Sequence, residues 1–345
     1  MKIWYGCNSI PRYIIEIRRA SGGVLSTFAA FCTKEHVNKG FEMTVKDRKA
    51  GAKPGRVQSH FLDSGAFTLW TKAAKWAEEN GKERWDYYDT DEFWQYMDDY
   101  AKFVKKYKVA IDFYANVDVI PNPELTWRNQ RYLEREHGLN PVPVVHYTTD
   151  LKWLRRYIDK GYDLIGIGGL VGRAKGSLCR DWMDEVFNMV CDTPDRLPMV
   201  KLHGFGVTSY PLLIRYPWWS VDSVSWAKIG GFGNILVPHK RGGKFDFSEA
   251  PYMMSMSMES PKQKVKGTHY TSLSSREQRI LREWLEVIGI PLGRVEGKEV
   301  VEHGVLTRHT ERRAANLLFF EKLREWLPEW PWPFKQRPKQ NFGFV

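Results

Sequence analysis

Residues 141–170 read PVPVVHYTTDLKWLRRYIDKGYDLIGIGGL, and this stretch decides the fold class. Two short apolar, β-rich runs, 141–147 and 162–170, flank a longer segment, 149–161, that ends at Gly161. The middle segment has the apolar spacing of an amphipathic helix, and glycine is typical of the residue at a helix end. A strand, a helix and a second strand in this order predict a βαβ unit with parallel strands.

The same alternation continues on both sides of this unit. Further β-rich runs lie at 57–63, 109–120, 198–207 and 218–224, with 2–9 and 23–31 as candidate first strands. Helix-like stretches lie between them at 91–107, 123–138 and 177–191. Roughly seven or eight such units predict an α/β fold, a closed (β/α)8 barrel of the TIM type, which typically takes ~250 residues. A doubly wound open sheet is the alternative, but no glycine-rich dinucleotide fingerprint follows the first strand.

The sequence changes in character after residue 237, and this sets the expected domain boundaries. We assign residues 1–237 to the barrel, 238–270 to a loop or insertion rich in Gly, Ser, Pro and Lys, and 271–345 to a mainly helical region packed on the barrel. In that last region Ser274 and Glu277 have capping-box spacing, and Gly289 ends the helix that they start. A final helix is predicted over 310–327.

The composition is that of a folded and basic protein. The 345 residues are 43% hydrophobic and carry a formal net charge of +11. This surplus favours a polyanionic partner, with nucleic acid first, although a generally basic surface gives the same charge. The 15 tryptophans and 16 tyrosines are interleaved with the cations, and flat aromatic rings beside cations suit unstacked bases, although most of the tryptophans are expected in the core.

Localisation and metal binding are constrained by what the sequence lacks. No apolar run approaches the ~20 residues that span a bilayer, and the N-terminus does not resemble a signal peptide. We therefore expect a protein of the cytoplasm, which is the host cytoplasm for a phage-encoded chain, with no membrane partner. The cysteines form no closely spaced pair, so the sequence supports neither a zinc site nor a disulfide framework. They are Cys7, Cys32, Cys179 and Cys191.

Polar residues recur at or near the carboxyl ends of six successive predicted strands, and this end carries the active site in parallel α/β barrels. Helix capping explains one such residue but not six in a row, so we interpret the set as a site. For single members a structural alternative stays open, because Ser64 is also a candidate N-cap and His203 a candidate core histidine. In chain order the set is Asp63, Asn116 and Asp118, His146, Gly168 and Gly169, His203, and Asp222.

Two carboxylates that face one pocket fit attack at an anomeric carbon. One is the nucleophile or stabilises an oxocarbenium-like transition state, and the other transfers a proton to or from the leaving group. The run IGIGGL (165–170) allows a planar ligand to approach backbone N–H groups, because glycine carries no Cβ. A tight turn between a strand and a helix accounts for this run equally well.

Five short motifs resemble, in order, those of the tRNA-guanine transglycosylases. The ordered match covers about residues 57–230, and the whole chain is more similar still to the phage-type members of this superfamily, which put 7-deazaguanine bases into DNA. The family fold is a (β/α)8 barrel, in agreement with the alternation of strands and helices. The motifs are DSGAF (63–67), NVDVI (116–120), GIGGL (166–170), HGFG (203–206) and SVDS (220–223).

The resemblance implies a role for each matching residue. Asp63 takes the place of the general acid/base, and Asp222 that of the nucleophile that holds the ribosyl carbon covalently. Asp118 falls where the family grips the pyrimidine edge of the base, and Gly169 and Leu170 match backbone donors to its exocyclic oxygen. The substrate-binding residues implied in this way are Ser64, Asp118, His146, Gly168, Gly169, Leu170 and His203.

The chain departs from the family pattern at four points. His146 stands where the family usually has glutamine, His203 replaces an apolar residue that covers the base, and the C-terminal zinc cluster is missing. The family also has two aspartates three residues apart, of which the second is the nucleophile, whereas the pair here is Asp222 and Ser225. A one-residue gap puts Asp222 in the nucleophile's place, and the other register leaves the chain without a nucleophile.

The resemblance implies a glycosyltransferase that exchanges guanine in DNA for a 7-deazaguanine of the preQ0 type, with no metal or redox cofactor. DNA is favoured over tRNA because the zinc cluster is missing, and a homo-oligomer is compatible with the sequence. The alternatives are a tRNA-guanine transglycosylase, a DNA glycosylase or nucleoside hydrolase, and a non-catalytic nucleic-acid-binding relative. Each expected nucleic-acid contact is also compatible with a solvated surface. These contacts are Lys240, Arg241, Lys262, Lys264, Lys266, Arg308, Arg312 and Arg313.

Overall fold

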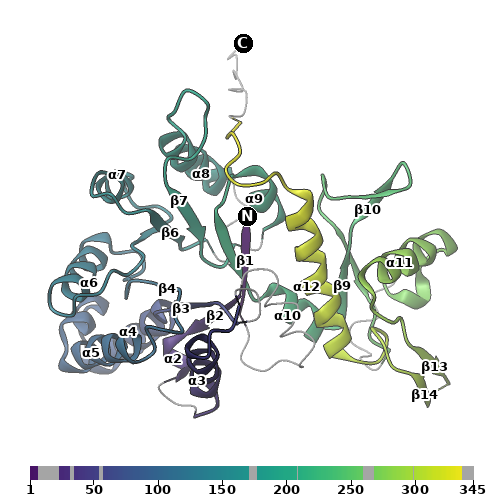
Figure 1. The fold of residues 1–345 in the computed structure, drawn as a ribbon, viewed down its shortest axis with the longest axis horizontal. Helices are drawn as coiled ribbons and strands as arrows, with labels where there is room; N and C mark the ends of the chain where they lie inside the picture. Colours follow the sequence, from purple (N-terminus) through teal and green to yellow (C-terminus); the bar gives the residue numbers. More distant parts are fainter. Residues whose placement is uncertain are drawn as a thin grey trace. The chain divides into compact units, whose positions relative to one another are not determined.

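The computed structural model of the chain describes residues 1–6, 23–31, 35–53, 57–170, 177–207, 209–258, 268–297 and 299–335. Eight of its strands form one parallel sheet in the order β4-β3-β2-β1-β8-β7-β6-β5 (Figure 1). These strands are β1 (Lys2–Gly6), β2 (Val24–Thr27), β3 (His60–Asp63), β4 (Phe113–Tyr114), β5 (Val144–His146), β6 (Leu164–Gly168), β7 (Lys201–Gly204) and β8 (Ser220–Ser223).

The two edges of this sheet meet. A parallel bridge joins Ala115, next to β4, to Val142, just before β5. Two backbone hydrogen bonds support it, from the Asn116 N–H to the Val142 carbonyl (2.9 Å) and from the Val142 N–H to the Tyr114 carbonyl (2.8 Å). The eight strands therefore follow one another around a barrel in chain order, and the predicted α/β fold of the TIM type is confirmed.

Helices follow the strands and lie outside them, as the view of α4 to α8 in Figure 1 shows. The helices predicted for this region are confirmed with slightly shorter bounds, and α2, α3, α4, η1, α9 and α10 are additional to them. The helices from β2 to the end of the barrel sequence are α2 (Phe28–Phe31), α3 (Glu35–Lys49), α4 (Ala66–Asn80), η1 (Arg84–Asp89), α5 (Asp91–Lys106), α6 (Pro123–Arg135), α7 (Lys152–Asp159), α8 (Ser177–Val190), α9 (Tyr210–Arg215) and α10 (Ser225–Gly231).

Local sequence explains where these helices begin and which face they bury. The Thr90 hydroxyl caps α5 by accepting the Phe93 N–H at 3.3 Å, and Phe93, Met97, Tyr100 and Val104 recur at the spacing of one helical face, which is buried. In α6, Asn122 caps the helix and Pro123 occupies the first turn, where proline costs no hydrogen bond.

Aromatic rings fill the interior of the barrel. The ring of Phe61, on β3, lies 4.5 Å from that of His203, on β7, and the Phe205 ring lies 4.4 Å from His203. Phe113, on β4, lies 5.8 Å from Phe61 and 5.3 Å from Trp219. Rings from strands on different sides of the barrel thus meet, and they form a packed core rather than a pore.

The chain divides into two compact units. The first contains Met1 and the described residues of Val24–Asp222 and Pro328–Val345, and the second contains those of Lys2–Gly23 and Ser223–Leu327. None of the described helices is long and apolar enough to cross a membrane. The elements that follow α10 are β9 (Asn234–Val237), β10 (His239–Arg241), β11 (Lys244–Asp246), β12 (Tyr252–Ser255), η3 (Tyr270–Ser272), α11 (Ser275–Ile288), β13 (Arg294–Glu296), β14 (Glu299–Glu302) and α12 (His309–Trp326).

Three local expectations differ from the structure. The run 23–31, a candidate strand, is a strand only at Val24–Thr27 (β2) and continues as the short helix α2. The run 109–120 forms a strand only at Phe113–Tyr114, because side chains of α6 hold the residues after it. The segment 238–270, expected as a loop or insertion, contains among its described residues the β10–β11 hairpin and β12, which pairs with β9. By contrast, α11 has the predicted capping box at Ser274 and Glu277, and Gly289 ends it at φ 67°.

Candidate active site

Asp63 and Ser64 stand at the carboxyl end of β3. Asp63 pairs with Thr27 of β2 in the sheet, and its Oδ2 accepts the Gly65 N–H at 3.2 Å. The Ser64 side chain is fully buried, and its hydroxyl donates to Asp118 Oδ1 at 3.4 Å. Gly65, at φ 85°, takes the N-cap position of α4, and no side chain caps this helix. Ser64 is therefore not an N-cap, and its hydroxyl points to the second carboxylate.

Asp118 lies in a loop that α6 holds in place. The Asn116 amide donates to the Thr126 carbonyl at 2.8 Å, and the Asn129 amide donates to the Val117 carbonyl at 2.8 Å. The Thr126 hydroxyl also accepts the Val119 N–H at 2.9 Å. These buried polar side chains form hydrogen bonds with the backbone in place of the bonds between paired strands, so the loop after β4 has a defined conformation.

Asp118 and His146 form a buried pair between the ends of β4 and β5. His146 Nε2 lies 2.7 Å from Asp118 Oδ2, and the two residues are 1% and 6% exposed. Because a carboxylate only accepts hydrogen bonds, Nε2 carries the proton in this pair. The pair leaves Asp118 Oδ1 with the long contact to Ser64, so this oxygen is available to a ligand donor.

The glycine-rich end of β6 lies against His146. A Cβ on Gly168 would come within 3.1 Å of His146 Cδ2, tighter than most such contacts, so the close approach of ring and strand favours a glycine there. Gly169 has φ 74°, a left-handed conformation that favours glycine, and Leu170 after it is buried. The Gly168 carbonyl accepts the Tyr147 N–H at 2.9 Å, which ties this turn to the end of β5.

His203 and Asp222 occupy the ends of β7 and β8. His203 is fully buried, with Nδ1 2.8 Å from the Ser220 hydroxyl and Nε2 3.6 Å from Asp222 Oδ1. Within the described residues His203 Nε2 has no hydrogen-bond partner. Asp222 Oδ1 accepts the Gly206 N–H at 2.7 Å, and the side chain is 9% exposed. Burial lowers the pKa of His203, and the charge of Asp222 acts against this shift.

The three carboxylates act on one another electrostatically. The pKa of Asp63 is raised to about 7, first by burial and then by the negative charges of Asp118 and Asp222. Hydrogen bonds from the Thr27 hydroxyl and the Gly65 N–H favour the charged form and oppose this shift. This shift brings the pKa of Asp63 toward neutral pH, where a group that both donates and accepts protons is most effective.

The strand-end residues named from the sequence thus come together at one end of the barrel, in the first unit. Three contributors were not singled out: Thr27, Gly206 and Ser220. Gly206 and Ser220 lie inside the quoted motifs HGFG and SVDS, whereas no sequence signal marked Thr27. Ser225, the alternative in the nucleophile register, is the first residue of α10, and its N–H donates to Ser223 Oγ at 3.1 Å.

Two of the expected nucleic-acid contacts, Lys240 and Arg241, lie on β10 in the second unit and have acidic partners. Lys240 forms an ion pair with Glu283 of α11. Arg241 pairs with Glu249 at 2.6 Å and with Asp246 at 3.4 Å. The ion pair of Arg241 with Glu249 is exposed and that of Lys240 with Glu283 is partly buried, and exposed ion pairs contribute little to stability, so Arg241 in particular remains compatible with a polyanionic ligand.

The three arginines at the start of α12 differ from one another. Arg312 is buried and donates to the Gly230 and Val305 carbonyls, which gives it a structural role and removes it from the candidate surface. Arg313 Nε donates to the Ala227 carbonyl at 3.2 Å, while Arg308 is exposed at the N-cap position. Lys262, Lys264 and Lys266 lie outside the described residues.

A metal centre has no support in the part of the chain that the structure describes, where His, Cys, Asp and Glu side chains form no group of three or more suited to an ion. No protein-family model matches the chain, and the curated proteins include no significant match to it. The function is therefore inferred from the residues and their geometry.

Proposed function

We propose that the chain is a glycosyltransferase that exchanges guanine in DNA for a 7-deazaguanine base through a covalent aspartyl-ribosyl intermediate. The observation that carries this proposal is the set of three carboxylates at the strand ends, in which Asp63 has a pKa of about 7. The order of the motifs around them, which resembles that of the tRNA-guanine transglycosylases, supports the same chemistry.

In the first half-reaction a carboxylate oxygen of Asp222 attacks C1′ of the target nucleotide, and the bond from C1′ to guanine breaks. Asp63 in its acid form gives its proton to the departing guanine and becomes a carboxylate. The Gly206 N–H holds Asp222 Oδ1 at 2.7 Å, which fixes the direction of this side chain. The nucleotide must leave the stack to reach Asp222, at a cost of a few kcal/mol.

In the second half-reaction the incoming 7-deazaguanine loses its N9 proton to Asp63 and forms the new bond to C1′, which releases the Asp222 carboxylate. Protons and charge balance over the cycle, because Asp63 returns to its acid form. Asp118 accepts hydrogen bonds from the pyrimidine edge of either base. His146 Nε2, 2.7 Å from Asp118 Oδ2, orients the Asp118 carboxylate. The backbone N–H groups of Gly169 and Leu170 donate to the exocyclic oxygen of the base.

The test is incorporation of labelled guanine into duplex DNA and, in parallel, into unmodified tRNA. Wild type is compared with Asp222→Asn, with Asp63→Asn and with Asp150→Asn, which changes an exposed aspartate outside the site as a matched control. A parallel reaction supplies a labelled 7-deazaguanine. We expect label in DNA with wild type and the control, and its loss in both site variants.

Other outcomes separate the alternatives. Label in tRNA alone makes the chain a tRNA-guanine transglycosylase. Release of guanine without incorporation indicates a glycosylase or hydrolase that uses water as the acceptor. If wild type neither labels a polymer nor releases a base, the non-catalytic nucleic-acid-binding alternative replaces the proposal.

A further inference from the structure

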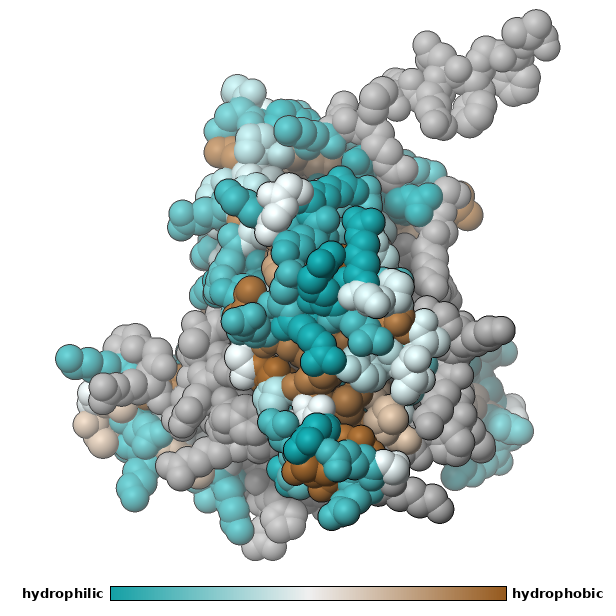
Figure 2. All heavy atoms as spheres, turned by 90° about the vertical axis from the view of Figure 1, so that its right-hand side faces the viewer, coloured by the Kyte–Doolittle hydropathy of each residue, from teal (hydrophilic) through white to brown (hydrophobic). Residues whose placement is uncertain are grey.

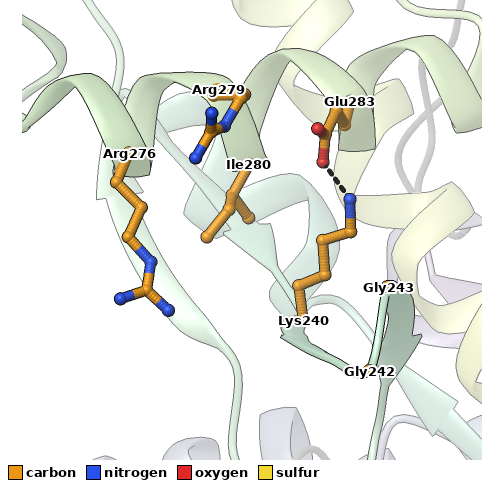
Figure 3. Close-up of a pocket in the computed structure, with 7 residues that line it drawn as sticks. All are labelled: Lys240, Gly242, Gly243, Arg276, Arg279, Ile280 and Glu283. Carbon is orange, nitrogen blue, oxygen red and sulfur yellow. Dashed lines mark hydrogen bonds and ion pairs between the residues drawn. The ribbon is translucent and has the colours of Figure 1, made fainter.

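A basic pocket lies in the second unit, between the β10–β11 hairpin and α11 (Figure 3). Its volume is about 420 Å³. Lys240 and the Gly242–Gly243 turn form one side, and Arg276, Arg279 and Glu283 project from α11 on the other. None of the strand-end residues of the barrel lines it.

The charges of this pocket do not balance. Lys240 forms an ion pair with Glu283, which leaves the guanidinium groups of Arg276 and Arg279 in excess. Both arginine side chains are exposed, and neither forms an ion pair or a side-chain hydrogen bond with a described residue. Residues three apart on a helix share one face, so these two cations repel each other. Glu277 already supplies a negative charge in the first turn of α11, so the unbalanced charge is that of the two guanidinium groups, which an anion would relieve.

The shape of the pocket favours an extended ligand. Gly242 and Gly243 have φ 53° and 81° and form the two-residue turn of the hairpin, and they add no side chains to this wall. Ile280 is the apolar residue among those that line the pocket, whereas sites for small molecules are mostly apolar and enclose their ligand. Figure 2 shows hydrophilic residues over the upper part of one face and hydrophobic residues gathered below them. A shallow basic groove of this kind suits one edge of a polyanion.

We propose that this pocket binds phosphate groups of the DNA backbone, with Arg276 and Arg279 as the two contacts. Backbone phosphates carry no sequence information, so the pocket acts as an anchor that does not depend on sequence. The choice of DNA as the polyanion rests on the proposed function. The pocket itself consists of residues that take no part in base exchange.

The experiment measures binding of the full chain to a short fluorescent DNA duplex by anisotropy over a series of salt concentrations, with no free base added. Wild type is compared with the double variant Arg276→Gln/Arg279→Gln. Arg282→Gln is the matched control, because Arg282 lies on the same helix outside the pocket and donates to the Tyr270 hydroxyl at 2.9 Å. Glu283→Gln, which removes the one carboxylate of the pocket, is the fourth protein.

For the double variant we expect binding weaker by about tenfold, and a plot of log K against log salt whose slope is smaller by about 1 for each lost phosphate contact. The control keeps the wild-type slope, and Glu283→Gln binds more tightly at low salt. A double variant with the affinity and slope of wild type would overturn the inference, as would a wild type that binds tRNA through these arginines but not DNA.

The two proposals fail in different ways. If base exchange is absent in wild type while the double variant still loses DNA affinity, the proposed function fails and the phosphate site stands. If wild type exchanges bases and the double variant binds DNA as wild type does, the phosphate site alone is wrong. Thermal unfolding of each variant shows whether a loss of binding reflects a loss of folding.

Discussion

Asp63 combines two requirements that conflict in most carboxylates. In the proposed mechanism it exchanges a proton with the base, while burial and two neighbouring carboxylates disfavour its charge and raise its pKa to about 7. The raised pKa has a consequence for stability. The folded state keeps a proton on Asp63 that the unfolded chain releases near its ordinary value of about 4, so the contribution of this group to stability is lost as the pH rises toward 7.

We expect Asp63→Asn to remove this dependence. Relative to the variant, the stability of wild type falls as the pH rises from about 4 to about 7, by roughly 2–4 kcal/mol in total. Base exchange by the variant drops by about 10²–10⁴-fold, because no group transfers the proton. Urea unfolding at pH 4.5 and pH 8, with Asp150→Asn as the control, measures the first effect. Equal pH dependence of both variants would contradict the raised pKa.

His203 has one satisfied and one unsatisfied ring nitrogen in a fully buried position. We expect His203→Phe to lower the free energy of unfolding by about 1–3 kcal/mol at pH 8, because the Ser220 hydroxyl is left without its hydrogen-bond partner. This loss becomes smaller toward pH 5. The pKa of His203 is lowered in the folded state, so the neutral ring stabilises wild type above about pH 6.5, and this contribution falls as the pH is lowered.

Chemical denaturation at both pH values measures this difference. The double variant His203→Phe/Ser220→Ala is the control, since removal of both partners is close to neutral. A loss that stays the same at pH 5 and pH 8 would show that protonation of His203 plays no part.

At the scale of elements, the end of β6 depends on close packing rather than on hydrogen bonds alone. A Cβ on Gly166 would lie 2.4 Å from Cε2 of Phe205, a ring that also packs on His203. We expect Gly166→Ala to lower the free energy of unfolding by about 1–3 kcal/mol, because the Phe205 ring must move. Since this ring packs on His203, we also expect the proposed base exchange to be slower.

Gly40→Ala is the matched control for this substitution. Gly40 lies in the middle of α3 with nothing within 4 Å of a Cβ, so alanine there is expected to stabilise the protein by about 0.5–1 kcal/mol. Melting temperatures of the two variants give the comparison. A Gly166→Ala protein as stable as wild type would show that the ring adapts freely.

At the scale of the whole molecule, residues from the two ends of the sequence meet. The Tyr5 hydroxyl, on β1, donates to Glu321, on α12, across a sequence separation of 316 residues, and both side chains are buried. Arg324 Nε also donates to this carboxylate, at 3.1 Å. Such a contact forms only when distant parts of the chain have folded together, and its loss leaves a buried charge with one donor fewer.

We therefore expect Tyr5→Phe to destabilise the protein by about 1.5–3 kcal/mol, the range for a hydrogen bond to a charged group. Tyr270→Phe, which removes a hydroxyl bonded to exposed Arg282, is the control and should change stability by less than about 0.5 kcal/mol. Thermal unfolding of the three proteins checks this. Equal stability of both variants would mean that other groups already satisfy Glu321.

Features that depend on interactions between residues close in sequence could be predicted, and features that depend on distant residues could not. Strand and helix alternation, the cap at Ser274 and the stop at Gly289 depend on neighbours within a few residues, and these predictions are confirmed. The positions of Asp63, His146, His203 and Asp222 at or near strand ends could also be predicted, because parallel strands in a barrel all end on one side, whereas Asp118 lies in the loop after β4.

Only the tertiary structure decided which of these side chains meet. Three contacts depend on barrel register between residues far apart in sequence. They are the pair of Asp118 and His146, the contact between Thr27 and Asp63, and the 3.6 Å approach of His203 Nε2 to Asp222 Oδ1. The pocket lined by Arg276 and Arg279 also depends on tertiary structure, because the sequence of α11 does not predict which hairpin packs beside it. The sequence by itself determined the elements and the chemistry each one carries, because those depend on local periodicity. Pairing, burial and charge imbalance were decided in three dimensions, because they depend on distances that no local pattern encodes.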